Sequence, residues 1–219
     1  MNSRIYVCPD DSGSLELVRE HAVVLRVSNP QRIAQAVADG QRICDSVVSV
    51  IVESDLSFDS VDWQQEWFSA PDIPVVLRAP SLGSFRRCVK PLAWLRRLGI
   101  RIWLPCNESS IRECKILASV GISSGMVFEH ELLPWELLGE LITYVVLPQV
   151  PHAPIEPFTS MARKLAAGEP YDWAGDFLDD PARFLYLDTG GSVALSRRDL
   201  ADRKFVGVGP NDPAVDVAI

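Results

Sequence analysis

The sequence has 219 residues, of which 47% are hydrophobic and 23% are charged, and its formal net charge is −8. These proportions are those of an ordinary globular protein and exclude a disordered chain. The negative charge disfavours nonspecific binding to nucleic acids or to anionic membranes, so neither is expected as a partner.

Short β-branched runs recur along the first part of the chain. They predict six strands, at residues 4–8, 23–28, 47–53, 73–78, 100–104 and 122–128. Several are continuous apolar blocks, which is typical of strands covered on both faces of a parallel sheet. Because the strands recur at the spacing of one strand–helix unit, we predict an α/β fold, specifically a partial (βα)6-type TIM-like barrel.

Helices are predicted between these strands from their capping residues. One begins after Asn29 and Pro30 and runs to Gly40. Two others cover residues 84–98 and 108–120, and each is followed by a glycine that can close a helix in the left-handed conformation. A proline at position 91 must kink the first of these two helices or mark a second start.

The most apolar stretch, residues 132–150, contains Glu136 and Glu140. A bilayer span needs about 20 nearly uncharged residues. We therefore interpret this stretch as a buried amphipathic helix and expect no membrane association.

The sequence changes character after this helix. Prolines at 148, 151, 154 and 157 predict an extended linker, followed by a helix that ends near residue 167. Residues 183–188 and 192–198 flank Thr189-Gly190-Gly191 and predict a β-hairpin. We therefore divide the chain into a (βα)-repeat partial barrel at 1–150 and, at 151–219, a linker, a helix, a C-terminal β-hairpin appendage and a flexible tail.

The cysteines are odd in number and scattered, at positions 8, 44, 88, 106 and 114. None forms a C-x-x-C pair, so the sequence encodes neither a zinc site nor a disulfide framework. Most have apolar neighbours, where a reduced cysteine acts as a small hydrophobic residue. Reduced cysteines indicate a cytoplasmic protein, and we expect no bound metal and no cofactor.

Two helix–glycine–strand junctions resemble those of a known family. Residues 91–102 read PLAWLRRLGIRI and residues 117–122 read LASVGI, and both are similar to the "LGI" junctions of radical S-adenosylmethionine enzymes. Residues 185–193, from Leu-Tyr-Leu-Asp to Gly-Ser-Val, resemble the hairpin of the C-terminal cluster-binding (SPASM-like) extension in peptide-modifying members. The resemblance implies a partial (βα)6 barrel with such an extension.

The cysteine motif of that family is absent. C-x-x-x-C-x-x-C supplies three thiolates to an iron–sulfur cluster, but here Cys8 is followed by Ser12 and Leu15 at the matching positions. Ser196 stands where the hairpin would carry a further cluster cysteine. The resemblance therefore implies a degenerate, pseudo-radical member that has lost its clusters.

Ligands of parallel α/β folds bind at the carboxyl ends of the strands. The candidate ligand-binding residues read from these ends are Glu53, Arg78, Asn107, Glu129 and His130. Arg78 could offer a two-pronged guanidinium to a carboxylate or phosphate. The alternative is that Asn107 caps a helix, that His130 lies in a surface loop and that the remaining residues are solvated. No catalytic residue is assigned.

Cations crowd the predicted helix at 84–98 although the chain is acidic. The partner-binding candidates are Arg86, Arg87, Lys90 and Arg97, with Arg96 beside them. One interpretation is a docking face for an acidic protein or peptide, steered by charge. The alternative is a solvated helix whose cations pair with carboxylates of the same chain.

The first function hypothesis is a non-catalytic accessory or binding protein, as a partner of a peptide-modifying radical enzyme. The second is a small (βα)-barrel enzyme that acts on a phosphorylated or carboxylated metabolite. The first is favoured because the sequence contains no complete catalytic triad, metal-binding motif or phosphate-binding loop. The sequence does not indicate an oligomeric state.

Overall fold

The computed structural model describes residues 4–68, 73–128, 135–169 and 183–218. Its contacts group the chain into two compact units. The first unit comprises Met1–Val52, Trp67–Pro74 and Trp173–Ile219, and the second comprises Glu53–Glu66 and Val75–Asp172. These units group residues by contact, whereas the division expected at residue 150 followed a change in composition.

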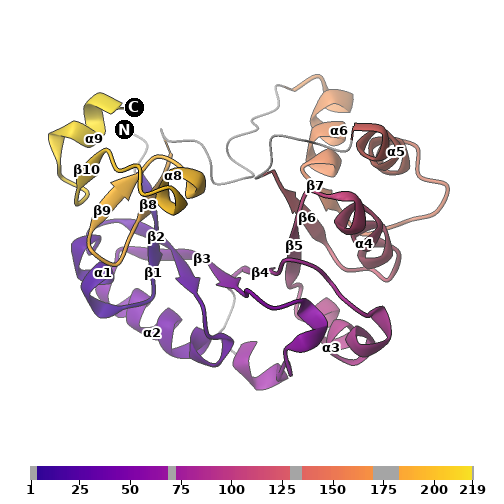
Figure 1. Cartoon of the computed structure of the whole chain (residues 1–219), viewed down its shortest axis with the longest axis horizontal. Helices are drawn as coiled ribbons and strands as arrows, with labels where there is room; N and C mark the ends of the chain where they lie inside the picture. The colour runs from indigo at the N-terminus through magenta and orange to yellow at the C-terminus, as the bar shows by residue number, and fades with distance from the viewer. Residues whose placement is uncertain (1–3, 69–72, 129–134, 170–182, 219) are drawn as a thin grey trace. The chain divides into compact units, whose positions relative to one another are not determined.

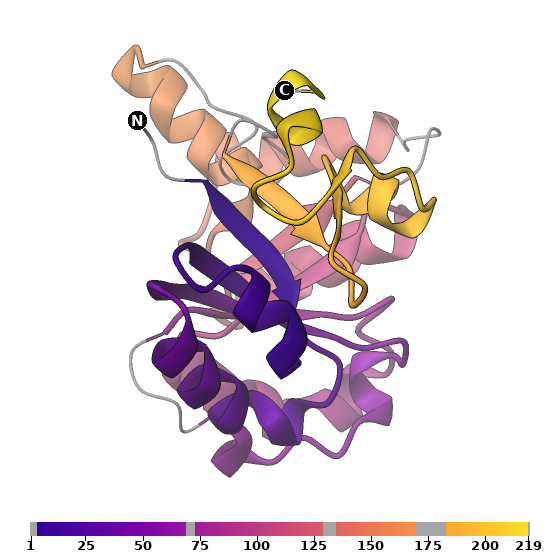
Figure 2. The same cartoon turned by 90° about the vertical axis from the view of Figure 1, so that its left-hand side faces the viewer.

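The sheet of the first unit is mostly parallel. Strands β1 (Ile5–Pro9), β2 (Ala22–Val27) and β3 (Ser46–Glu53) are neighbours in parallel, and β8 (Phe184–Leu187) pairs in parallel with the other side of β1. The antiparallel strands β9 (Ser192–Ala194) and β10 (Gly207–Val208) follow. The helices of this unit, seen in Figures 1 and 2, are α1 (Ser12–Leu17), η1 (Pro30–Arg32), α2 (Ile33–Ile43), α8 (Arg197–Ala201) and α9 (Pro213–Ala218).

The second unit contains four parallel strands in sequence order. They are β4 (Val75–Arg78), β5 (Arg101–Pro105), β6 (Ser124–Val127) and β7 (Ile155–Glu156). Its helices are η2 (Phe58–Ser60), α3 (Phe85–Arg97), α4 (Glu108–Ser119), α5 (Trp135–Val146) and α6 (Phe158–Ala167), while η3 (Gln65–Phe68) crosses the boundary between the units. The predicted α/β class is thus confirmed, and all six predicted strands are present with small shifts at their ends.

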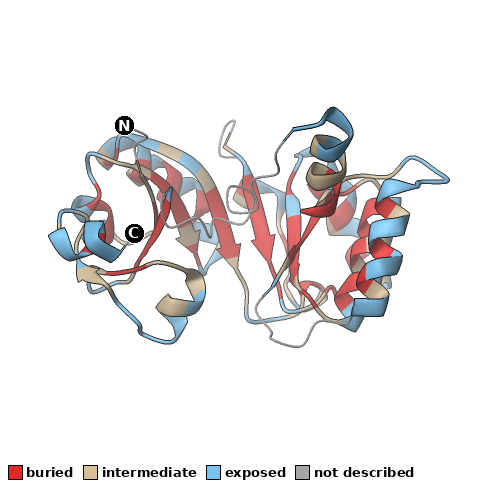
Figure 3. Ribbon diagram, turned by 90° about the horizontal axis from the view of Figure 1, so that it is seen from above, coloured by how far each residue is buried: buried red, intermediate tan, exposed pale blue. Residues whose placement is uncertain are grey.

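The core lies between the strands and the inner sides of the helices, as Figure 3 shows in red. All residues of β4 are buried, as the continuous apolar pattern predicted. The first half of β3 differs from that prediction, because Val48 is 41% exposed. Val47 faces α2, where a Cβ built on Gly40 would lie 2.8 Å from its Cγ2. The helix therefore covers only one face of β3 at this point.

Glycines close two helices of the second unit as predicted. Gly99 and Gly121 have φ values of +67° and +81°, and the next residues bond back to the helix, with Ile100 N–H donating to Leu95 C=O at 3.2 Å. The prediction for Gly40 was wrong, because α2 continues past it to Ile43. Gly40 instead allows α2 to approach β2 and β3 closely.

Pro91 lies inside one continuous helix, α3.

None of the helices in the described part of the chain is long and apolar enough to cross a membrane.

The C-terminal hairpin forms as predicted, with Tyr186 opposite Ala194. Asp188 Oδ1 shapes its turn by accepting hydrogen bonds from the N–H groups of Gly190 and Ser192, at 2.9 and 2.6 Å. The tail, for which the sequence predicted no elements, contributes β10 and α9. Val215 of α9 is fully buried, which fixes that short helix in the first unit.

Candidate functional site

Arg78 is more buried than Glu53, the other charged strand-end candidate that the structure describes. It ends β4, and its side chain is 8% exposed. Its Nη1 lies 3.5 Å from Oε1 of Glu53, and its guanidinium carbon lies 5.4 Å from the centroid of the Trp103 ring. Its Nε makes no hydrogen bond in the described part of the chain. This guanidinium therefore has a donor left for an anion. A bound anion would also lower the cost of burying the cation, which is high unless the charge is well paired.

A glycine on the neighbouring strand leaves space for the side chain of Trp103. A Cβ built on Gly125 of β6 would lie 2.6 Å from the indole Nε1 of Trp103 on β5. Only glycine therefore leaves room for the indole beside Arg78. Neither residue could be selected from the sequence, because an isolated glycine and a tryptophan in apolar strands carry no polar signal.

The other strand-end candidates are not gathered around Arg78. Asn107 accepts hydrogen bonds from Ser110 N–H and Ser109 Oγ at 2.9 and 2.8 Å, so it caps α4, as the alternative interpretation proposed. Glu129 and His130 lie outside the described residues. Of the predicted set, the structure brings together only Glu53 and Arg78 among the residues it describes.

The cations of α3 are all exposed. They are Arg86, Arg87, Lys90, Arg96 and Arg97, and none of them forms an ion pair within the described ranges. The opposite side of the helix is buried through Cys88, Leu92 and Leu95. This helix is the strongest local concentration of positive charge in an otherwise acidic protein.

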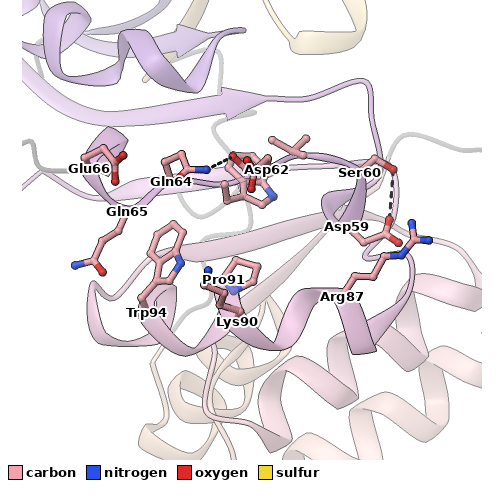
Figure 4. Close-up of a pocket in the computed structure, with 12 residues that line it drawn as sticks. Asp59, Ser60, Asp62, Gln64, Gln65, Glu66, Arg87, Lys90, Pro91 and Trp94 are labelled. Atoms are coloured by element: carbon pink, nitrogen blue, oxygen red, sulfur yellow. Dashed lines mark hydrogen bonds between the residues drawn. The ribbon is translucent and has the colours of Figure 1, made fainter.

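A hollow of about 470 Å³ lies between one side of α3 and the segment that contains η2 (Figure 4). Arg87 and Lys90 line it from the helix, while Asp59, Asp62 and Glu66 line it from the facing segment. Hydrogen bonds from the Ser57 hydroxyl and the Ser84 N–H, with the nearby charge of Arg87, lower the pKa of Asp59. The hollow therefore has mixed charge.

A groove of about 360 Å³ lies on another side of the same helix. Its apolar lining comes from α3 and from the segment that leads into β6, through Phe85, Val89, Leu92, Ala93, Val120 and Ile122. Among the described residues, Arg96 and Arg97 are the only charged ones that line it. This groove was not predicted from the sequence, in which Val120 and Ile122 indicate only a helix–strand junction.

The residues that the resemblance to radical enzymes matched with cluster cysteines have structural roles in this chain. Asp11 accepts a hydrogen bond of 2.9 Å from Ser14 N–H and so begins α1 at Ser12, while Leu15 is fully buried. Ser196 caps α8 by accepting a hydrogen bond from Asp199 N–H. Cys8 is fully buried, and its burial raises the pKa of its thiol. Ser12 and Leu15 carry no thiol, so these residues do not fit an iron–sulfur cluster, which is held by several cysteine thiolates.

The cysteines as a set agree with the prediction of small buried hydrophobic residues. All five are buried and free, and burial raises the pKa of Cys44, Cys88 and Cys106 to about 11 and that of Cys114 to about 12. In the part of the chain that the structure describes, no three His, Cys, Asp or Glu side chains are placed to hold a metal ion.

One solved structure, that of SuiB from Streptococcus suis bound to S-adenosylmethionine, is similar to this chain. The TM-score is 0.53 at 10% sequence identity, and the match covers 99% of this chain and 63% of SuiB. At this identity the similarity shows the fold alone, and it agrees with the α/β class expected from the sequence. No protein-family model and no curated protein matches the sequence.

Proposed function

We propose that this chain is a non-catalytic accessory protein that binds an acidic polypeptide through α3. The observation that carries the proposal is the set of five exposed cations on one helix, none paired to a carboxylate in the described residues. Like charges three or four residues apart destabilise a helix, so this arrangement has a cost that a partner would offset. Exposed charge of one sign also accelerates encounter with a partner of the opposite sign.

The relation to radical enzymes is the second part of the proposal. The chain keeps a similar fold, possesses a serine and a leucine at two of the three cluster positions, and uses the surrounding residues to begin α1. We propose that it is a degenerate partial-barrel member that acts beside an active, peptide-modifying radical enzyme. Anaerobic reconstitution with iron and sulfide should leave it colourless, whereas stoichiometric iron with visible absorption would contradict this part.

The partner-binding part is tested with polyglutamate as the probe. Replacing Arg86, Arg87, Lys90 and Arg97 with glutamine should weaken binding and flatten its dependence on salt, since exposed charges are screened. The matched control replaces four exposed cations from elsewhere, Arg19, Arg32, Arg42 and Lys204, which already have carboxylate partners. Both variants change the net charge equally. Equal loss in the two would mean that only net charge matters and would contradict the proposal.

A second candidate function is favoured by the buried guanidinium of Arg78. In this alternative the chain is a small (βα)-barrel enzyme whose Arg78 binds the carboxylate or phosphate of a metabolite. A ligand that binds only the folded state raises the melting temperature. Succinate or inorganic phosphate should therefore stabilise the protein, and the effect should vanish in Arg78→Met but persist in Asn107→Ala. No stabilisation by either anion would remove this candidate.

A further inference from the structure

The two sides of α3 differ in their charge environment. The hollow beside Arg87 and Lys90 is lined by three carboxylates from the chain itself. The electrostatic effect of Arg87 already extends to Asp59, whose pKa it helps to lower. An incoming acidic segment would meet repulsion from these carboxylates as well as attraction to the two cations.

On the groove side of α3, no carboxylate of the described residues lines the groove to offset its cations. Of the described residues that line the groove, Arg96 and Arg97 are charged and the others are apolar. Val89, one of the α3 residues that line the groove, is 53% exposed. Residues four and seven positions apart share a helix face, which places Phe85, Val89 and Arg96 in one row. Apolar surface beside unopposed cations suits a segment that carries both an apolar side chain and carboxylates.

Arg96 lies along the groove rather than away from it. A Cβ built on Gly121 would lie 2.7 Å from its Nε, so the guanidinium crosses directly over this glycine. Gly121 has a φ of +81°, which the helix end requires. The same glycine that closes α4 therefore leaves room for the Arg96 side chain next to Val120 and Ile122.

We infer that the acidic partner docks on the groove side of α3 and not on the side of Arg87 and Lys90. An apolar side chain of the partner fills the groove against Val89 and Ala93, and flanking carboxylates pair with Arg96 and Arg97. This inference rests on the proposed function and specifies the chemistry of the partner, which is an acidic peptide segment with an apolar anchor. Buried apolar anchors supply affinity, while rim charges supply orientation and speed of association.

The probe is the peptide Glu-Glu-Leu-Glu-Glu, titrated into the isotopically labelled full-length protein and followed by amide chemical shifts, which report weak binding. Shifts should concentrate on residues 89–97 and 120–122. Arg96→Glu with Arg97→Glu should weaken binding about tenfold, since two exposed ion pairs become repulsive. The matched variant Arg87→Glu with Lys90→Glu makes the same change in charge and should leave the affinity within about twofold.

The apolar part is tested separately. Glu-Glu-Ser-Glu-Glu should bind about tenfold more weakly than the leucine peptide, because it has nothing to bury in the groove. Val89→Ser in the protein should remove the difference between the two peptides. Thermal melts of all variants establish that they remain folded, and the residues changed are exposed.

The outcomes separate this inference from the proposed function. If Arg87 and Lys90 matter and Arg96 and Arg97 do not, the docking side is wrong although α3 still binds acidic partners. If neither pair matters, both the inference and the proposed function are wrong. If sedimentation shows dimers that Val89→Ser disrupts and the peptide does not bind, the groove is occupied by a second copy of the chain, which also overturns the inference.

Discussion

The carboxylate of Asp59 accepts a hydrogen bond of 2.9 Å from the backbone N–H of Ser84. Ser84 is the N-cap of α3 but makes no cap bond with its own side chain. Asp59, on η2, therefore supplies the acceptor that the start of α3 lacks. Its negative charge also offsets the unfavourable placement of Arg86 and Arg87 at the positive end of the helix dipole.

Asp59→Ala should lower the urea midpoint of unfolding at neutral pH. Because hydrogen bonds from Ser57 and Ser84 lower the pKa of Asp59 below its ordinary value of 3.8, the ionised carboxylate stabilises the fold. That contribution is complete above the unfolded pKa and is lost as pH falls through the folded one. The difference between wild type and variant should therefore narrow below pH ~4. A difference that is constant with pH would show that the charge of Asp59 contributes nothing.

Gly83→Ala should be more destabilising than Gly99→Ala. Both glycines have positive φ, +74° and +67°, so both variants incur the left-handed cost of about 1–2 kcal/mol. At Gly83 the new Cβ would also lie 2.0 Å from Oδ1 of Asp59, whereas at Gly99 nothing lies within 4 Å. Only the first variant must displace the Asp59 carboxylate from Ser84. Equal unfolding free energies would mean that this clash is relieved without loss.

The sequence correctly predicted those helix ends that depend only on residues adjacent along the chain. Gly99 and Gly121 close α3 and α4 because a helix end needs a left-handed residue that glycine adopts at low cost. Gly40 looked the same in sequence, yet it lies inside α2. Because Gly40 has no side chain, α2 can pack closely against Val47 and Leu25, which are distant from it along the chain. Local sequence cannot distinguish these two uses of glycine.

The part of the candidate site that lies at the ends of strands could be predicted from the sequence. Glu53 and Arg78 meet because they end successive strands of the predicted repeat. Asn107 does not join them, because its side chain satisfies the free N–H groups at the start of α4. The groove beside Arg96 depends on how two helix–strand junctions pack together, and no single segment of sequence contains that information.

The cysteines should resist a thiol reagent in the native protein at pH 8 and all react in urea. Burial is the cause, and it raises the pKa of the Cys114 thiol from 9.0 to about 12. Because the neutral thiol is favoured in the folded state, its contribution to stability is complete below pH 9 and is lost as pH rises towards 12. The urea midpoint should therefore fall in alkali. Rapid native labelling of any cysteine would contradict its burial.

Gly125→Ala should destabilise the protein by about 1–3 kcal/mol, the usual cost of overpacking a core. The added Cβ would lie 2.6 Å from Nε1 of Trp103, and the indole must move away from the Arg78 guanidinium that it contacts at 5.4 Å. A matched control is Gly139→Ala on α5, where nothing lies within 4 Å. That variant should gain up to about 1 kcal/mol from helix propensity.

A double-mutant cycle identifies the cause of this cost. Phenylalanine at position 103 is smaller than the indole and lacks Nε1, the atom nearest to the new Cβ. The cost of Gly125→Ala should therefore shrink by about 1 kcal/mol or more in a Trp103→Phe background, because residues in contact are energetically coupled. Urea unfolding of the four proteins measures the coupling. An unchanged cost would show that Gly125 acts through its own backbone, and that the indole beside Arg78 is positioned by other contacts.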